Sequence, residues 1–281
     1  MRPLLRPPLP DQVRGRYTAA SLLMSAFGHF CAFCERPLPD QHWVWNARTG
    51  TCLDRESYDV DDWSHLYLLD HNCHQAQQAS SAIDPGTLLL PTEENVFDLH
   101  GESQLHYSLQ PLLRTLLDDD ARPVTHELVP SVLINGRSAR ALATIDYFKL
   151  NTRYYDDETQ TLRIPWQDHL SLEDRRMEQR TRTWLEAEAL AKRVLRSFSY
   201  GLESVVIEQF RQMAGLSGYW SAAATAAARM RDPGLRRRIF VDAAESAGRD
   251  VFIEGFNPGE SALFRGSGPH HTFPGTRNVF E

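Results

Sequence analysis

Side chains that can bind a metal ion lie at two places in the first third of the chain. Cys31 and Cys34 are separated by two residues, and Asp70 and Cys73 repeat the same spacing farther along. A Cys-x-x-Cys turn presents two thiolates from one loop, and zinc takes four Cys, His or carboxylate ligands in a tetrahedron. We therefore predict a structural Zn²⁺ site formed by Cys31, Cys34 and Cys73, with Asp70 as the fourth ligand.

Two features of this interpretation have alternatives. His71 or Cys52 could take the place of Asp70 as the fourth ligand. The Cys-x-x-Cys pair could also form a disulfide or remain as two buried thiols. Residues 1–8 contain no apolar core of a secretory signal. We therefore expect a cytoplasmic protein, in which thiols stay reduced and a disulfide is disfavoured.

The sequence around these ligands resembles the HNH endonucleases, which have the ββα-metal fold. Three runs carry the likeness: Cys-Ala-Phe-Cys-Glu-Arg-Pro from Cys31, Trp-x-His-Leu from Trp63, and Leu-Leu-x-x-x-Cys-His from Leu68. The chain is similar in particular to the HNH proteins that occur beside ATPases in bacterial retron and Septu-type antiphage operons. Weaker likenesses to these proteins lie at residues 141–151 and 273–276.

The resemblance implies a catalytic site beside the structural zinc. Cleavage of a phosphodiester needs a base that activates water and a cation, Mg²⁺ or Mn²⁺, that polarises the phosphate and stabilises the leaving oxygen. The resemblance implies His42 as the general base and, with His74, as a ligand of this divalent ion. It implies His65 as the residue that orients the base or contacts the phosphate. Relatives carry an acidic residue before the base, where this chain has Gln41 preceded by Asp40.

The resemblance leads to two candidate functions of different classes. The first is an HNH-type endonuclease that cleaves DNA or tRNA, as the effector subunit of an antiphage defence complex with an ATPase partner. The alternative is a catalytically degenerate HNH-like subunit that binds zinc and has an assembly role in such a complex. An Asp40 carboxylate that reaches the same ion as His74 would favour the enzyme. A zinc-knuckle transcription regulator is disfavoured by the acidic composition and the lack of a recognition helix.

The composition limits how the protein can bind nucleic acid. The 281 residues include 30 Lys and Arg against 37 Asp and Glu, which gives a formal net charge of −7. This balance argues against a cationic coat for tight nonspecific binding and suits a nuclease that depends on a partner. No apolar run approaches the roughly 18 residues that span a bilayer, so we expect no membrane association.

For the whole chain we expect an α+β fold in which a ββα-metal zinc module is embedded in a mostly helical chain. Residues 1–100 should form an N-terminal arm and the HNH-like module. Residues 101–281 should form a mainly helical region for partner binding or substrate support. Within the second region, Arg236–Arg238 form the densest basic cluster and are candidates for phosphate contacts.

Local patterns predict the elements that position the ligands. A helix should span residues 17–27 and end at Gly28, and Trp43–Trp45 should begin a strand that turns at residues 49–51 into a second strand. Leu66, Leu69, Cys73 and Ala76 recur at helical spacing, which predicts one helix that carries Asp70 and Cys73 on a single face.

The second region should contain five helices and short strands. We expect a short helix from residue 109 that runs into a solvated acidic loop at residues 118–120, and helices over residues 138–150, 172–198, 202–216 and 219–230. Strands should lie over residues 95–107 and 132–135, with a further one just before this region at residues 87–91. Charges alternate along residues 172–198 and include Arg176 and Arg180. This alternation predicts an exposed bundle helix laced by salt bridges. Asn151 is a candidate cap for the helix before it.

Overall fold

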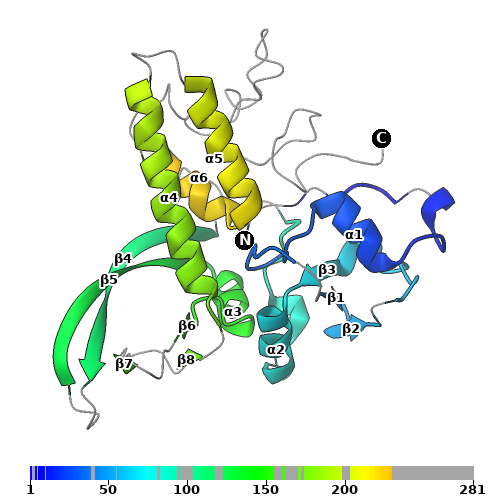
Figure 1. Ribbon diagram of the computed structural model, residues 1–281. Helices are drawn as coiled ribbons and strands as arrows, with labels where there is room; N and C mark the ends of the chain where they lie inside the picture. Colours follow the sequence, from blue (N-terminus) through cyan, green and yellow to red (C-terminus); the bar gives the residue numbers. More distant parts are fainter. Residues whose placement is uncertain are drawn as a thin grey trace.

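The structure is a computed structural model that describes residues 1–229 with short gaps. The gaps are residues 2–3, 5, 10, 39–41, 55, 81–82, 94–95, 97–103, 118–122, 155–159, 162–169, 172–173 and 198–202. The basic cluster predicted at Arg236–Arg238 lies outside the described residues. The described chain mixes helices with sheets (Figure 1), so the coarse prediction of an α+β fold is confirmed.

The N-terminal part combines helix α1 with a small three-stranded sheet. Helix α1 spans Ala19–Phe27 and ends, as predicted, at Gly28, whose φ is 83°. Strand β1 (Trp43–Asn46) lies in the centre, with β2 (Thr51–Leu53) on one side and β3 (Leu66–Leu69) on the other, both antiparallel to it. Helix α2 (His71–Ala79) follows β3 after a single residue.

The single helix predicted from Leu66 to Ala76 is wrong in its first half. All four residues of β3 are buried. A fully buried strand is apolar at every position, so the spacing of its apolar residues does not distinguish it from a buried helix. The helix begins only after Asp70. The strand predicted at residues 87–91 is also absent, because Pro85–Thr87 form a short 3₁₀ helix and the described residues 88–91 belong to no strand.

A long hairpin forms where a helix was expected at residues 109–120. Strand β4 (Leu105–Leu117) pairs with β5 (Pro123–Gly136) in an antiparallel ladder that starts at Leu105 opposite Gly136. The hairpin curves away from the rest of the chain (Figure 1). Pairing between distant segments overrides the local apolar pattern, and one sequence segment alone does not reveal it. Three two-residue strands lie near it: β6 (Arg153–Tyr154), β7 (Gln160–Thr161) and β8 (Leu170–Ser171).

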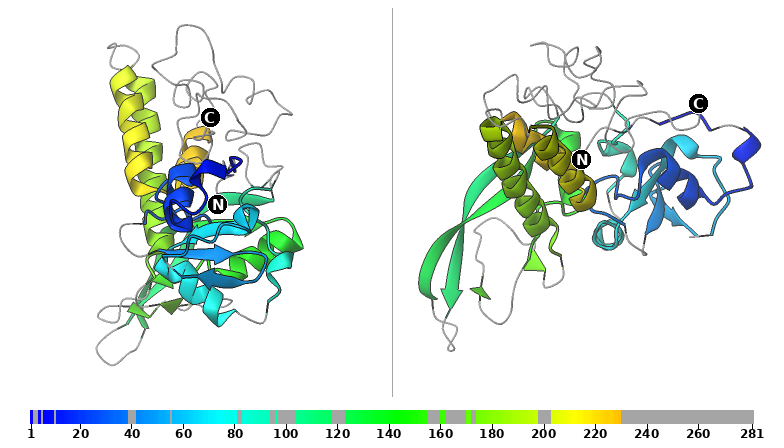
Figure 2. Two further views of the ribbon diagram at one scale, coloured as in Figure 1. Left: turned by 90° about the vertical axis from the view of Figure 1, so that its right-hand side faces the viewer. Right: turned by 45° about the horizontal axis from the view of Figure 1, so that its top comes forward.

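Four further helices agree with the predicted ones in order and approximate position. Helix α3 (Ala139–Tyr147) is capped by the hydroxyl of Ser138. Helix α4 (Arg176–Ser197) begins later than predicted and packs along α5 (Glu203–Ser217) and α6 (Trp220–Ala228). Both views in Figure 2 show α4 and α5 side by side. Helices α4, α5 and α6 form a bundle, and α4 and α6 contact the β4–β5 hairpin.

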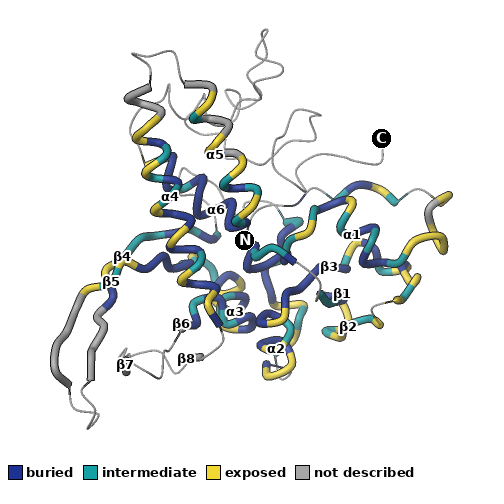
Figure 3. Tube along the Cα trace, viewed as in Figure 1, coloured by how far each residue is buried: buried dark blue, intermediate teal, exposed yellow. Residues whose placement is uncertain are grey.

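One continuous hydrophobic core joins the N-terminal sheet to the later elements. The ring of Phe33 stacks on that of Phe148 with 4.0 Å between centroids, and the fully buried Trp45 contacts both. Buried residues gather where β1, β3 and α3 meet the beginning of α4 (Figure 3). The predicted boundary at residue 100 lies outside the described residues and stays a prediction. The described parts on its two sides share this core.

Glu35 ties the loop that follows Cys34 to the helical bundle. Its buried carboxylate accepts hydrogen bonds from the Tyr107 hydroxyl at 3.0 Å and the Ser221 amide at 2.8 Å, and it pairs with the Met1 amino group at 2.8 Å. Burial acts to raise the pKa of Glu35, but the Met1 ammonium and these hydrogen bonds outweigh it and lower the pKa. The Glu35 backbone has a φ of 69°.

Gly218 lies against this loop, and its missing side chain gives the first prediction. A Cβ at Gly218 would lie 2.2 Å from the Glu35 carbonyl oxygen, and the φ of Gly218 is +72°. Gly15 has a similar φ of +69° with nothing within 4 Å, so it is a matched control. Gly15→Ala should cost about 1–2 kcal/mol of unfolding free energy through backbone strain. Gly218→Ala should cost about 1–3 kcal/mol more, because the backbone must shift.

Urea denaturation of the two variants measures this difference. Equal losses of unfolding free energy would show that the contact between Gly218 and Glu35 does not hold the loop against the bundle.

Candidate metal centre

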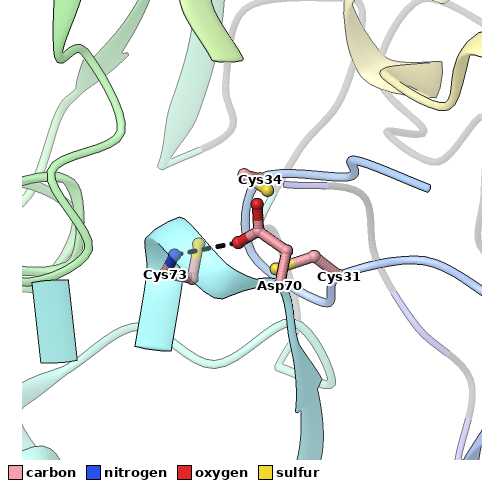
Figure 4. Close-up of side chains that lie close together, drawn as sticks. All are labelled: Cys31, Cys34, Asp70 and Cys73. Atoms are coloured by element: carbon pink, nitrogen blue, oxygen red, sulfur yellow. Dashed lines mark hydrogen bonds between the residues drawn. The ribbon is translucent and has the colours of Figure 1, made fainter. Parts of the chain in front are cut away.

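The four side chains predicted to bind zinc lie together in the fold. Their ligand atoms, the Sγ atoms of Cys31, Cys34 and Cys73 and a carboxylate oxygen of Asp70, all lie within 4.8 Å of one another, and the four residues are buried (Figure 4). A zinc tetrahedron with Zn–S bonds of about 2.3 Å has edges of about 3.8 Å, so small side-chain rotations would close the group around an ion. The cluster could therefore hold a metal such as zinc.

The first two ligands come from a tight loop, which we call the knuckle and define as residues 30–37. The Glu35 amide donates to the Cys31 carbonyl at 3.1 Å, and the Cys31 amide donates to the Arg36 carbonyl at 2.9 Å. The Ala32 amide donates to the Leu68 carbonyl at 2.9 Å, which fixes the knuckle on β3. The short Cys-x-x-Cys spacing thus places two sulfur atoms over the end of the sheet.

The other two ligands come from the junction of β3 and α2. Asp70 is the N-cap of α2, and its Oδ1 accepts a hydrogen bond from the Cys73 amide at 2.9 Å. Its Oδ2 is buried without a hydrogen-bond partner and lies 3.7 Å from Nη1 of Arg36. A buried carboxylate oxygen without a hydrogen bond is costly, and a metal ion would satisfy it. Burial, with the nearby Cys34 thiol, raises the pKa of Asp70 to about 6.

The three thiols differ in their tendency to ionise. Burial raises the pKa of Cys34 to about 12 and that of Cys73 well above its ordinary value. Burial also acts to raise the pKa of Cys31, but hydrogen bonds from Cys34 and Cys73 outweigh it and hold that pKa well below its ordinary value. Cys31 is therefore the thiol of the cluster that ionises most readily. A bound divalent metal would displace the protons of the other two thiols.

A buried guanidinium from α4 reaches the same cluster. Nη1 of Arg176 lies 3.0 Å from Sγ of Cys73, in position to donate a hydrogen bond, and the residue is 1% exposed. Asp174 accepts from Nε and Nη2 of Arg176, and the carbonyls of Phe148 and Lys149 accept from Nη1 and Nη2. The buried cation thus links the metal centre to a helix more than a hundred residues away in the sequence.

The prediction that α4 is an exposed helix laced by salt bridges is therefore wrong for two of its arginines, whereas its Arg182–Glu186 and Glu188–Lys192 salt bridges are confirmed. Arg176 and Arg180 are buried, and Arg180 donates to the carbonyls of Val132 and Leu150. The sequence did contain a signal, because Arg176, Arg180 and the buried Trp184 recur every four residues and so share one helix face. Asn151 also differs from its predicted role as a cap. Its amide group exchanges hydrogen bonds with the backbone of Ile134 in β5.

The alternative fourth ligands lie outside the cluster. Cys52 is on β2, where its Sγ is 3.9 Å from Oε1 of Gln77. His71 is the exposed first residue of α2, and its ring lies against that of Trp43, 5.6 Å away. Asp70 therefore occupies the position that the fourth ligand requires.

The histidines assigned to catalysis lie at different places around the sheet. The ring of His74 stacks on that of Trp43, with 4.4 Å between centroids and 8° between planes. Burial, together with His71, lowers the pKa of His74, so its imidazole is neutral at pH 7. His42 directly precedes Trp43, the first residue of β1. His42 and His74 therefore both lie near the start of β1.

His65 is at the other end of the sheet. The ladder between β1 and β3 runs from Trp43 opposite Leu69 to Asn46 opposite Leu66, and His65 precedes Leu66. At about 3.4 Å per residue, His42 and His65 are separated by roughly 17 Å along the strands. Asp40 and Gln41 lie outside the described residues. The catalytic roles of the three histidines stay predictions.

Within the described part of the chain, the Cys31, Cys34, Asp70 and Cys73 group is the one set of three or more potential ligands whose atoms come together. Comparison of the chain with family models, with curated proteins and with solved structures found no match. Among the described residues, no helix combines the length and apolar character needed to cross a bilayer.

The metal ligands give a prediction with an internal control. Cys34→Ser should reduce bound zinc to below half an equivalent and abolish cooperative unfolding, because metal binding is part of the folding free energy of such sites. Cys52→Ser should keep one equivalent of zinc, since its thiol lies outside the cluster. Elemental analysis and thermal unfolding of the purified proteins measure both effects. A Cys34→Ser protein that folds normally without metal would contradict the assignment.

The buried arginines of α4 give a second comparison. Arg176→Gln should weaken zinc binding by roughly 10- to 100-fold, the usual effect of removing a side chain that supports a metal ligand. Arg180→Gln should change zinc affinity by less than about threefold, because Arg180 makes no hydrogen bond to a ligand residue among the described contacts. Both variants should lose stability.

Competition with a chelator measures zinc affinity in these variants, and the sulfur-to-cobalt absorption band of the Co²⁺-loaded proteins should shift only in Arg176→Gln. Equal affinities and identical spectra for the two variants would mean that Arg176 stabilises the fold and has no effect on the metal site.

Proposed function

We propose that this chain is an HNH-like protein whose zinc ion is structural. The observation that carries the proposal is the group of four buried ligands contributed by the knuckle and by the start of α2. Structural zinc sites have four protein ligands and no open position, whereas catalytic zinc sites keep a position for water or substrate. Three thiolates and a carboxylate suit zinc better than Mg²⁺, which prefers oxygen ligands alone.

For the protein as a whole, we infer an assembly role in a multi-protein complex, with the HNH-like module as a zinc-stabilised scaffold. One feature supports this role over catalysis. His42 and His65 lie at opposite ends of the β1–β3 ladder. A general base must lie within hydrogen-bond reach of its water, and a residue that orients the base must touch it.

The second candidate is the endonuclease, and the position of His74 favours it. His74 directly follows a zinc ligand on α2, and its neutral imidazole can bind a divalent ion. In this candidate His42 and His74 hold Mg²⁺ or Mn²⁺, which would polarise a phosphate of DNA or tRNA. His42 would take the proton of the attacking water. His65, at the other end of the sheet, would contact a different part of the substrate.

Cleavage assays with the four proteins, wild type and His42→Ala, His65→Ala and His74→Ala, separate these candidates. The substrates are duplex DNA and tRNA, with Mn²⁺ or Mg²⁺, in the presence of the neighbouring gene product. For an assembly subunit, we expect wild type to cut no faster than His74→Ala, and all four to elute with the partner in size exclusion. Cys34→Ser should lose the partner, because its module unfolds.

Cleavage by wild type that falls by more than about a hundredfold in both His42→Ala and His74→Ala would instead establish the nuclease. Zinc content should stay at one equivalent in all three histidine variants, because the zinc ligands are other side chains.

A further inference from the structure

A groove of about 800 Å³ lies between the knuckle and the helical bundle. Its apolar walls come from both sides of the molecule: Phe30, Pro37 and Leu38 from the knuckle side, and Met213, Leu216 and Tyr219 from the end of α5 and the start of α6. Helix α4 contributes polar side chains between these walls, including those of Gln179 and Arg182. The groove is separate from the four metal ligands.

The walls of the groove are fixed before anything binds. The Tyr219 amide donates to the Glu35 carbonyl at 3.1 Å, and the Tyr219 hydroxyl donates to Oε1 of Gln179 at 2.9 Å. Gly218 packs directly on Glu35. A groove with rigid walls binds at a lower entropic cost than one that must form on binding.

Arg36 contributes a cation to the groove, and part of its guanidinium is available for further hydrogen bonds. Its Nη1 donates to Oδ1 of Asn72 at 2.8 Å and lies 3.7 Å from Asp70. Its Nε and Nη2 have no acceptor in the described part of the chain, and its side chain is 34% exposed. A guanidinium with two open nitrogens can hold a carboxylate through two hydrogen bonds. The second arginine at the groove, Arg182, is already paired with Glu186 at 2.8 Å.

An apolar side chain at the mouth of the groove is exposed to solvent. Leu216 is 82% exposed, the highest value among the large hydrophobic residues described. Helix α5 ends beside it at Ser217, and the Ala214 carbonyl in its last turn accepts a hydrogen bond from the Gly218 amide at 3.1 Å. Apolar walls beside a single available cation suit a ligand with apolar side chains and one negative charge. A nucleic acid backbone carries repeated negative charges and no apolar side chains.

From these features we propose that the groove is the docking site for an extended segment of a partner protein, in which one acidic residue is flanked by apolar residues. The carboxylate binds Arg36, and the apolar side chains cover Leu216 and fill the space between Phe30 and Met213. The overall charge of −7 repels a strongly acidic tract, so the segment carries a single acid at this place. The proposal holds whether or not the HNH-like module cuts nucleic acid.

End-capped pentapeptide libraries test it on the full-length, zinc-loaded protein. The libraries contain Leu, Phe and Val around a central Asp, Asn or Lys, and equilibrium dialysis with mass spectrometry measures the retained fraction. Wild type should retain the Asp library at least tenfold better than the Asn and Lys libraries. Leu216→Glu should lower this retention at least tenfold, because it places a negative charge at the mouth.

Val205→Glu is the matched control, since Val205 is 53% exposed on the same helix and does not line the groove. It should retain the Asp library within twofold of wild type, and both variants should melt like wild type. No preference for the Asp library, or equal losses in the two variants, would overturn the proposal. Competition by a short oligonucleotide would assign the groove to nucleic acid instead. A change in sedimentation of Leu216→Glu alone would assign it to a second copy of the chain.

Discussion

The cations beside the buried cluster of Cys31, Cys34, Asp70 and Cys73 organise much of this structure. Three thiolates and one carboxylate around a Zn²⁺ ion would leave two net negative charges, and burying them without positive partners would cost several kcal/mol. Arg176 approaches the sulfur of Cys73, and Arg36 approaches the free oxygen of Asp70. One of these cations belongs to the knuckle and the other to α4. The centre is therefore electrostatically complete only when the bundle has docked on the N-terminal sheet.

Glu35 adds a second link between the same two parts. It follows the second knuckle cysteine directly, and its carboxylate and carbonyl bind Tyr107, Tyr219 and Ser221. The knuckle is thus held by β4 and α6, whereas α4 reaches the cluster through the contact between Arg176 and Cys73. The metal cluster and the helical region are separate segments of the sequence. In the structure, however, their described parts pack together around one core.

The sequence was sufficient to predict which four side chains form the cluster and where most helices lie, because these depend on local signals. The Cys-x-x-Cys spacing and the glycine at the end of α1 are each set by neighbouring residues. Strand β3 and the β4–β5 hairpin were not predicted, because a buried strand and a long-range ladder depend on partners far away in the chain. Arg176 and Arg180 were misassigned to the surface for the same reason. Their acceptors lie on Cys73, β5 and the loop after α3.

The position of Arg176 in the chain also affects biosynthesis. All four candidate metal ligands are synthesised before residue 80, whereas Arg176 follows about a hundred residues later. At roughly 5–20 residues per second, several seconds separate the synthesis of the cysteines from that of the cation that they contact in the fold. During that interval Cys73 has no guanidinium beside it, so the electrostatic environment of the cluster is completed only after α4 has been made.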